Sequence, residues 1–513
     1  MTSPRSPGYR LRQVTFAAMF LPLTACMVGP DFERPDAPIL DNWSAGAGLP
    51  IDRRTGFTTR SEAVAEWWKL FHDETLNQLV LDAYRQNVGV QAAGVRIYQA
   101  RAQLGIATGE LFPQQQQIVG AYKKEKFATN EPVLNRIRKF IPFDPKITRV
   151  EVGFDAGWEI DLWGKIRRNV QSAEANLASN IASYDDALVT LTGDVAATYV
   201  TIRELQQLIA IARRNAKLQK ENLRIAQLQL KEGTATELDV DEGNIIYNNT
   251  LALIPEFQSQ LAQAENAMSI LLSEPPGAVR ARLAKPAGLP KVPATVAIGV
   301  PADMLRRRPD IRVAEYEAAA QSAQIGVAKA DLYPSFSISG AIGVKASNFA
   351  DLFSPASVTH LISPGFTWDF LNYGRILNNV RVQDATFEEL LLNYRNTVLS
   401  AYAEVENGLV AFLKAKQEGL YYAKSVNAAR HAVELVVNQY KNGTADFDRV
   451  VDVQKDLLNA EKRKLAARAD ELTDIIAVYK GLAGGWIPPN VEGFAFDSSA
   501  ERMRERTNWG GLL

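Results

Sequence analysis

Four carboxylates recur along one short stretch of this 513-residue chain, and carboxylates can act as acids, bases or metal ligands. They are Glu151, Asp155, Glu159 and Asp161. A convergent pair could serve a glycosidase, and a convergent cluster could bind a cation. All four occupy odd-numbered positions, so in an extended strand they lie in a row along one face and do not converge. We therefore predict a charged wall that favours passing cations, with neutral solvation of the carboxylates as the alternative, and no catalytic residues.

Other constellations that carry chemistry are missing from the sequence. His72, His360 and His431 are scattered singly, and the single cysteine, Cys26, cannot form an intramolecular disulfide. The sequence has no Gly-x-Ser-x-Gly, phosphate-binding loop, His-Glu-x-x-His or dinucleotide fingerprint. With 57 Lys and Arg against 58 Asp and Glu, it also lacks the basic footprint of nucleic-acid binders. We expect no enzyme activity, no cofactor, no metal and no nucleic-acid partner.

The first 25 residues are typical of a bacterial export signal. Arginines precede an apolar stretch, residues 14–25, that is too short for a transmembrane helix, which needs about 20 residues. The stretch ends in Leu23-Thr24-Ala25-Cys26, the pattern of a lipobox, where signal peptidase cuts before a lipid-modified cysteine. A plain secretory signal is the alternative. Because the only cysteine stands where lipidation requires it, we predict lipidation at Cys26, and Met27 after it favours the outer membrane.

The mature chain is an internal duplication. Residues 158–170 match residues 368–380 at an offset of 210, and the Gly-Thr-Ala sequences that begin at Gly233 and Gly443 have the same offset. A third match, Leu111-Phe112-Pro113 with Leu332-Tyr333-Pro334, has an offset of 221. Three matches in the same order are improbable by chance. An internal repeat of this kind has to be recognised before the fold is assigned.

A heptad pattern with a stutter predicts two long helices, one in each repeat. The pattern runs over residues 166–230 and again over 376–440, with no proline in either stretch. Helices of about 68 residues would each be about 100 Å long. Each should turn at its Gly-Thr-Ala sequence and return through a helix of half that length. The four half-length helices are predicted at residues 75–111, 236–272, 301–332 and 446–482, which gives an antiparallel rod.

The period changes from helix to strand after each Leu-aromatic-Pro motif. In residues 149–162, seven apolar residues alternate strictly with charged residues and glycines, as in a strand between lipid and an aqueous lumen. Residues 335–345 repeat this alternation, 361–371 carry three aromatic residues on one face, and 114–127 alternate poorly. A half-buried strand of a soluble sandwich is the alternative, although about 14 residues exceeds the usual strand length.

Four strands cannot close a barrel, because the smallest membrane-spanning barrels commonly have about eight. The chain is therefore expected to oligomerise, with each copy donating four strands and a four-helix rod. Three copies would give twelve strands, and the sequence alone allows two or four copies equally well.

Several runs of residues resemble those of the TolC/OprM-type outer membrane efflux proteins, in their lipoprotein (NodT-like) branch. The resemblance covers nearly the whole mature chain, and it is specific because several runs of residues occur together. The runs are Cys26-Met27-Val28-Gly29-Pro30-Asp31-Phe32 with Arg34-Pro35, Trp67-Trp68-Lys69-Leu70-Phe71 with Asp73 and Leu76, Trp158-Glu159-Ile160-Asp161-Leu162-Trp163-Gly164, and Arg307-Arg308-Pro309-Asp310-Ile311-Arg312 with Ala314-Glu315.

The resemblance implies a mixed α and β fold, mainly α: a trimeric outer membrane β-barrel with four strands per chain, continuous with a long periplasmic α-helical barrel. It implies a lipid-anchored exit duct of a tripartite system that exports drugs or other small molecules. The implied partners are a periplasmic adaptor (membrane fusion) protein and an inner-membrane resistance-nodulation-division transporter. A duct for type I protein secretion with an ABC exporter is the alternative. A purely structural coiled-coil spacer is less compatible with the alternating strands.

In this family the two helical turns at the periplasmic tip contact the adaptor and form part of the entrance. The resemblance carries that role onto Gly233, Thr234, Thr236, Asp239, Val240, Gly443, Thr444, Asp452 and Val453. Simple helix capping is the alternative role for both turns. Arg449 stands where the first turn has Asp239, which departs from exact repetition.

These elements predict the organisation of the chain. A signal peptide (1–25) precedes a lipid-anchored linker and equatorial segment (26–72). The first structural repeat (73–277) and the second (301–486) each contribute helices and two barrel strands. An equatorial linker (278–300) joins the repeats, and an equatorial tail (487–513) ends the chain.

Overall fold

The computed structural model describes two compact units of the chain. The described residues are 27–36, 43, 57–58, 66–128, 136, 140, 144–293, 296–297, 305–484 and 497–512, so Cys26 lies outside them. The sheet unit combines Met1–Asp31, Ala107–Val170 and Ala323–Gln383. The helix unit combines Phe32–Ile106, Gln171–Ser322 and Asp384–Leu513.

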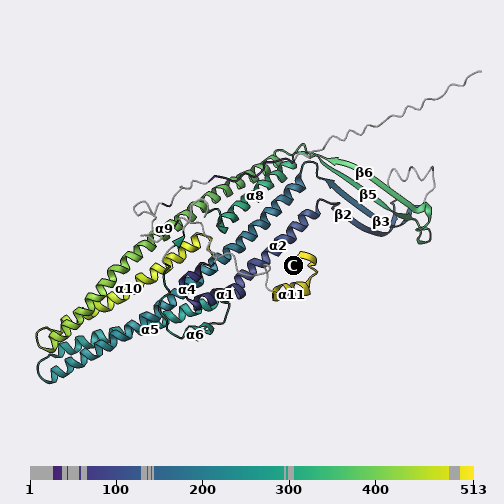
Figure 1. Ribbon diagram of the computed structural model, residues 1–513. Helices are drawn as coiled ribbons and strands as arrows, with labels where there is room; N and C mark the ends of the chain where they lie inside the picture. The colour runs from purple at the N-terminus through teal and green to yellow at the C-terminus, as the bar shows by residue number, and fades with distance from the viewer. Residues whose placement is uncertain are drawn as a thin grey trace, which may run out of the picture. The chain divides into compact units, whose positions relative to one another are not determined.

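Two long helices dominate the chain, α4 (Lys165–Lys231) and α9 (Arg375–Lys441), each of 67 residues. Each is followed by an antiparallel helix of 35 residues, α5 (Glu237–Leu271) or α10 (Phe447–Gly481) (Figure 1). The heptad pattern and the returns at half length are therefore confirmed. In the part of the chain that the structure describes, no helix is both long and apolar enough to span a membrane.

The helix predicted at 75–111 is confirmed over most of its length, but Asn87 divides it into two helices, α1 (Glu74–Gln86) and α2 (Val88–Gly109). Between them, the Asn87 side chain accepts a hydrogen bond from the Val90 N–H (3.0 Å) and donates one to the Leu271 carbonyl (2.8 Å). A side chain that caps a new helix and bonds to another segment competes with continuation of the first helix.

The helix predicted at 301–332 starts later, as α8 (Pro309–Ala330). Proline suits the first helical position because the N–H that it lacks would have no partner there. Arg308, directly before it, is buried and donates to the carboxylates of Asp310 (2.8 Å) and Glu404 (2.8 Å) and to the Gly481 carbonyl (2.8 Å). This arginine ties the start of α8 to α9 and to the end of α10.

Shorter elements complete the described chain. Strands β1 (Phe57–Thr58) and β4 (Val296–Ala297) pair in parallel. The short helices are η2 (Trp67–Phe71), α6 (Ala278–Leu283), η3 (Phe349–Asp351), η4 (Pro355–Ser357), α11 (Asp497–Arg506) and η5 (Gly510–Leu512).

The sheet unit holds a four-stranded antiparallel sheet in the order β2-β3-β5-β6 (Figure 1). Its strands are β2 (Gln115–Lys126), β3 (Lys146–Ile160), β5 (Ser335–Ala346) and β6 (Val358–Thr367). All four predicted strands are confirmed, including the poorly alternating first one. Ile118 lies opposite Phe154, and Phe154 opposite Ile342, so these apolar side chains share one face.

The predicted strand 361–371 is too long at its C-terminal end. Thr367 pairs with Ser335, the first residue of β5, so β5 offers no partner to Trp368 or Phe370. Pro334 precedes Ser335 and has no N–H with which to extend the ladder.

The main hydrophobic core lies in the helix unit around Trp67. This side chain is fully buried, stacks on Tyr479 of α10 with ring centroids 5.4 Å apart, and meets Phe71 edge-on at 5.9 Å. Trp68 and Leu79 of α1 are fully buried in the same cluster. The Trp-Trp-Lys-Leu-Phe run is therefore an anchor that joins the start of α1 to the end of α10.

Replacing this anchor should weaken the helix unit strongly. We expect Trp67→Ala to lower the free energy of unfolding by about 3–5 kcal/mol, because it removes a buried aromatic side chain and leaves a cavity. Denaturant titration with far-ultraviolet circular dichroism measures the change. Tyr421→Ala, at an exposed position of α9, is the matched control, with an expected change within about 0.5 kcal/mol. Equal losses in both variants would contradict the assignment of Trp67 as a core anchor.

Candidate functional site

The two long helices end in turns of the same geometry. Gly233 and Gly443 have φ values of +75° and +70°, a left-handed conformation in which glycine is least strained. The N–H of Thr234 donates to the carbonyl of Gln229 (2.9 Å), and Thr444 makes the equivalent bond in the second turn (2.9 Å). These bonds belong to the Schellman motif, which satisfies the last carbonyls of a helix.

The helices that follow these turns start differently. At the start of α5, the Thr236 N–H donates to the Asp239 carboxylate (3.0 Å) and the Asp239 N–H donates to the Thr236 hydroxyl (3.4 Å), which is a capping box. At the start of α10, the N-cap residue Asp446 makes no side-chain capping bond. Arg449 occupies the position of Asp239 there, and a guanidinium has no acceptor for an N–H.

A hydrophobic cluster joins the two hairpins below their turns. Its buried members come from α4, α5, α9 and α10: Ala226, Ile246, Val436, Tyr440, Phe447, Val450 and Val451. The rings of Tyr440 and Phe447 lie 5.0 Å apart. The cluster fixes the two turns beside each other, so together they form one surface.

The predicted contact residues divide into two groups on this surface. Val240 and Val453 pack against the hydrophobic cluster. Asp239 is half-buried, and the remaining six are exposed: Gly233, Thr234, Thr236, Gly443, Thr444 and Asp452. The exposed group is available to a partner, whereas the two valines support the turns from below.

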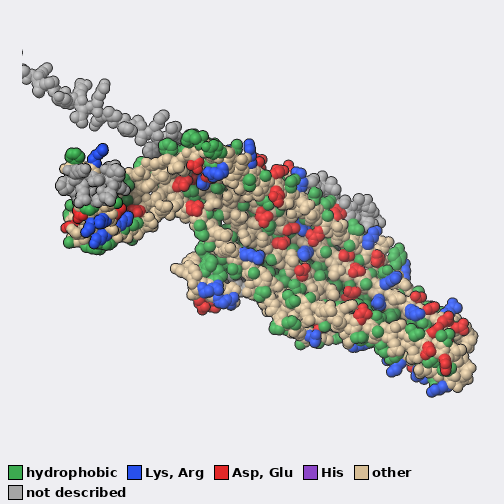
Figure 2. All heavy atoms as spheres, turned by 180° about the vertical axis from the view of Figure 1, so that it is seen from behind, with side chains coloured by type: hydrophobic (Ala, Val, Ile, Leu, Met, Phe, Trp, Pro, Cys, Tyr) green, Lys and Arg blue, Asp and Glu red, His purple; other side chains and the backbone are tan. Residues whose placement is uncertain are grey.

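The starts of α5 and α10 carry more negative than positive charge. Their acidic residues are Glu237, Asp239, Asp241, Glu242, Asp446, Asp448 and Asp452, and basic residues at Arg449 and Lys455 stand among them. Burial, together with Asp448 and Asp239, raises the pKa of the Glu242 carboxyl. Burial, with Asp239 nearby, raises the pKa of Tyr440 to about 12. Figure 2 shows charged side chains crowding this end of the helices, and the excess of acid suits a partner with basic side chains.

The four carboxylates predicted as a charged wall have different surroundings. Glu151 lies between Lys123 of β2 and Lys345 of β5, each with an N–O distance of 3.7 Å. Asp155 and Glu159 occupy the same face of β3 by alternation. Because two lysines balance Glu151, a preference of this face for cations stays a prediction for Asp155 and Glu159.

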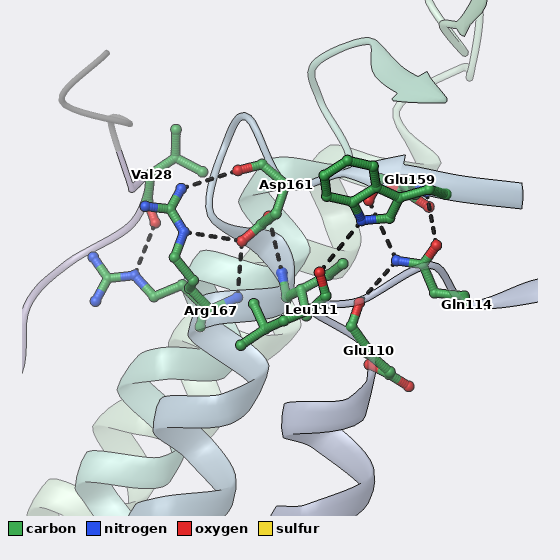
Figure 3. Close-up of polar contacts among 10 residues, drawn as sticks. Val28, Glu110, Leu111, Gln114, Glu159, Asp161 and Arg167 are labelled. Carbon is green, nitrogen blue, oxygen red and sulfur yellow. Dashed lines mark hydrogen bonds and ion pairs between the residues drawn. The ribbon is translucent and has the colours of Figure 1, made fainter. Parts of the chain in front are cut away.

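Asp161 lies just beyond β3 and caps α4. Its carboxylate accepts hydrogen bonds from the Ile166 N–H (3.1 Å) and from the N–H (3.0 Å) and guanidinium (3.0 Å) of Arg167 (Figure 3). The segment predicted as strand to residue 162 therefore ends at Ile160. A carboxylate at the start of a helix satisfies N–H groups that have no partner within the helix.

Two side chains that join the first Leu-aromatic-Pro motif to β3 were missed from the sequence. Gln114 accepts a hydrogen bond from the Glu159 N–H (2.7 Å) and donates one to the Glu159 carbonyl (3.3 Å). The Trp158 indole donates to the Leu111 carbonyl (3.3 Å) (Figure 3). The sequence carries one signal of the Gln114 contact. Gln114 stands between Pro113 and the start of β2, whereas β5 follows Pro334 directly.

Arg168 of α4 was also missed, and it holds the segment that follows Cys26. Its buried guanidinium donates to the carbonyls of Val28 (3.1 Å) and Gly29 (3.2 Å). A Cβ atom on residue 29 would lie 2.4 Å from the Cα atom of Gly326. The φ of Gly29, +100°, also favours glycine. The Gly-Pro-Asp-Phe run thus starts with a residue that this close contact requires.

In the described part of the chain, no group of three or more His, Cys, Asp or Glu side chains is arranged to hold a metal ion.

The capping box predicts a difference in stability between the two turns. Thr236→Ala should destabilise the start of α5 by about 1 kcal/mol, because two N–H groups lose their acceptors or their geometry. Hydrogen exchange of residues 237–242 measures this change. Asp446→Ala is the matched control for residues 447–452, since Asp446 makes no side-chain capping bond. An equal acceleration of exchange in both variants would contradict the role of the capping box.

Comparison with known proteins identifies the family. A profile described as "Outer membrane efflux protein" matches residues 79–273 and 300–484. Nodulation protein T of Rhizobium leguminosarum bv. viciae is 29% identical over 489 residues, which is 93% of this chain and 94% of that protein. Pyoverdine export outer membrane protein OpmQ of Pseudomonas putida is 28% identical, over 86% of this chain and 93% of that protein.

A solved structure, that of the outer-membrane channel OprN, agrees in sequence and in fold. It is 30% identical, with a TM-score of 0.82 over 90% of this chain and 100% of that chain. The chain belongs to the outer membrane efflux protein family of the TolC/OprM type, and it is the outer membrane exit duct of a tripartite efflux system that extends into the periplasm.

Proposed function

We propose that three copies of the chain close one twelve-stranded barrel in the outer membrane and one helical channel in the periplasm. The observation that carries this proposal is the sheet: within the described residues, β2 pairs only with β3 and β6 only with β5. In lipid, every backbone N–H and C=O needs a protein partner. A four-stranded sheet can meet that requirement only by pairing its two outer strands with other copies.

The exposed side chains of the sheet support the same proposal. Ile118, Phe154, Ile342 and Phe366 are large apolar residues that are exposed on the strands. An apolar band on one face and charged residues on the other suit a strand between lipid and water.

Lipidation of Cys26 would add a second attachment to the membrane. Acyl chains such as palmitate would anchor the mature N-terminus, and more than one chain is needed for stable anchoring. The hydrogen bonds from Arg168 to the carbonyls of Val28 and Gly29 support this role, because they fix the segment directly after the cysteine. The predicted segments, with repeats at 73–277 and 301–486 and equatorial segments between and after them, belong to the same proposal.

The exposed residues of the two turns would contact a periplasmic adaptor, which an inner-membrane resistance-nodulation-division transporter would accompany. The acidic starts of α5 and α10 favour an adaptor surface with basic side chains. The names of relatives that are 26% identical, such as antibiotic and toluene efflux pump proteins of Pseudomonas putida, favour small organic molecules as cargo and a contribution to multidrug resistance. The chain would conduct this cargo without catalysing a reaction.

Photocrosslinking in cells tests the contact at the turns. A photoreactive amino acid at Thr234 should capture an adaptor of a resistance-nodulation-division system, which mass spectrometry would identify. The same amino acid at Phe353, an exposed position between β5 and β6, is the control and should capture no adaptor. Capture of an ABC exporter's adaptor would favour protein secretion. Capture of no periplasmic protein while trimers form would contradict the role of the turns.

Neighbouring residues of β3 test the assignment of its two faces. Phe154→Arg should impair insertion of the trimer by about 2–4 kcal/mol for a site near the middle of the bilayer. Asp155→Arg, one residue away and on the other face, should leave insertion nearly unchanged. The fraction of the protein found as trimers in isolated outer membranes measures both effects. The face assignment is wrong if Asp155→Arg impairs insertion more than Phe154→Arg.

A further inference from the structure

The junction between β3 and β5 joins the first repeat to the second, and it has its own set of contacts. Trp163 stacks on Tyr333 with ring centroids 4.7 Å apart, and its indole donates to the Pro334 carbonyl (2.8 Å). Lys165 forms an ion pair with Asp331 at 2.7 Å. These contacts lie at the end of the sheet where α4 begins.

The duplication gives an equivalent for every residue of this junction. Strand β3 corresponds to β6 at an offset of 210, and the Leu-aromatic-Pro motifs correspond at 221. The Trp158 indole donates to the Leu111 carbonyl (3.3 Å), and its equivalent Trp368 donates to the Leu332 carbonyl (3.1 Å). Because the same bond recurs in both repeats, the equivalence holds in three dimensions as well as in sequence.

Within the strands, β2 corresponds to β5 at an offset of 220. Ile118 pairs with Phe154 of β3, and Ile338 pairs with Pro364, the residue of β6 equivalent to Phe154. The extra residue in the first repeat is Gln114, whose side chain bonds to both main-chain groups of Glu159 and so fits into the ladder. The register of β6 and β2 therefore follows from that of β3 and β5.

The equivalent residues at the outer strands keep the chemistry of the junction. Tyr373 corresponds to Trp163 and Phe112 to Tyr333, so the aromatic pair is retained. Arg375 corresponds to Lys165 and Glu110 to Asp331, so the opposite charges are retained. In one chain Tyr373 is 99% exposed and Phe112 is 65% exposed. A tyrosine with that exposure gains nothing from packing until another surface covers it.

These residues cannot meet within one chain, because β2 and β6 form opposite edges of the sheet. We propose that β6 of one copy pairs antiparallel with β2 of the next copy in one defined register. Trp368 then lies opposite Ile118, as Trp158 lies opposite Ile338. Tyr373 packs on Phe112, and Arg375 pairs with Glu110, across the boundary between copies.

The same register explains the two aromatic residues beyond the end of β6. Ile160 of β3 pairs with Phe336 of β5, so their equivalents Phe370 and Gln116 pair between copies. Trp368 and Phe370 lack partners on β5 but gain them on β2 of the next copy. The strand β6 therefore extends to Phe370 in the assembly. This proposal rests on the proposed oligomer and specifies its contacts.

Disulfide crosslinking tests the register. Residues directly opposite on an antiparallel pair have Cβ atoms about 4.5–5.5 Å apart, close enough for a disulfide after small shifts. Trp368→Cys with Ile118→Cys should give covalent trimers on non-reducing gels after mild oxidation. Trp368→Cys with Gln116→Cys, or with Gly120→Cys, keeps the same face but shifts the register by two residues, so these are the matched controls. The single variants, which also contain Cys26, correct for other thiol reactions.

The outcomes separate this proposal from the proposed trimer. Preferential crosslinking of either shifted pair would overturn the register. Absence of crosslinking in all three pairs, while native gels still show trimers, would overturn the pairing of β6 with β2. Absence of oligomers in the unmodified protein would instead overturn the proposed function.

Charge reversal gives a second readout that does not depend on thiol geometry. Arg375→Glu or Glu110→Arg alone should increase trimer dissociation by up to about fivefold, the range of an exposed ion pair, and the double variant should restore it. Lys165→Glu with Asp331→Lys reverses the equivalent pair inside one chain and is the control, without a coupled effect on dissociation. Additive losses in the Arg375 and Glu110 double variant would contradict the ion pair between copies.

Discussion

A strand edge inside a lipid bilayer has to be paired, and the proposed assembly of this chain follows from that constraint. One chain supplies four strands and leaves a row of N–H and C=O groups along β2 and along β6. In water such edges are a liability, whereas in lipid they are prohibitively unfavourable. In the proposed oligomer the duplication would solve this problem, because an edge from the first repeat would pair with an edge from the second, as β3 and β5 pair within one chain.

The repeats differ at the points where the chain must be asymmetric. Arg168 holds the N-terminal segment through the carbonyls of Val28 and Gly29, while its equivalent Asn378 accepts a hydrogen bond from Arg381. Because each chain has one N-terminal segment, only one repeat needs an arginine that binds it. The turns diverge in the same manner, since the capping carboxylate of Asp239 is replaced by Arg449. A partner that contacts both turns therefore meets two different surfaces.

Sequence periodicity predicted the long elements well because their burial is periodic. The heptad pattern located α4 and α9 nearly to the residue, and strict alternation located β3 and β5. Two of the errors, the break after α1 and the late start of α8, lie where a single side chain bonds to a distant main-chain group. Asn87 breaks a helix by bonding to Leu271, and nothing near it in the sequence shows that partner. The exposed turn residues were located through a family resemblance, and their role at an adaptor stays a prediction.

Polar side chains at the ends of helices and strands serve the backbone, and one of them, Asp161, belongs to the four carboxylates that first suggested chemistry. Asp161 caps α4, Arg308 binds the carbonyl of Gly481, and Gln114 bonds to both main-chain groups of Glu159. Each lies where a helix or strand ends, and such ends leave main-chain groups without partners. In the long helices and strands of this chain, such groups are left mainly at the ends. Polar side chains that bind main-chain groups at these ends keep the backbone hydrogen bonding of the duct wall continuous.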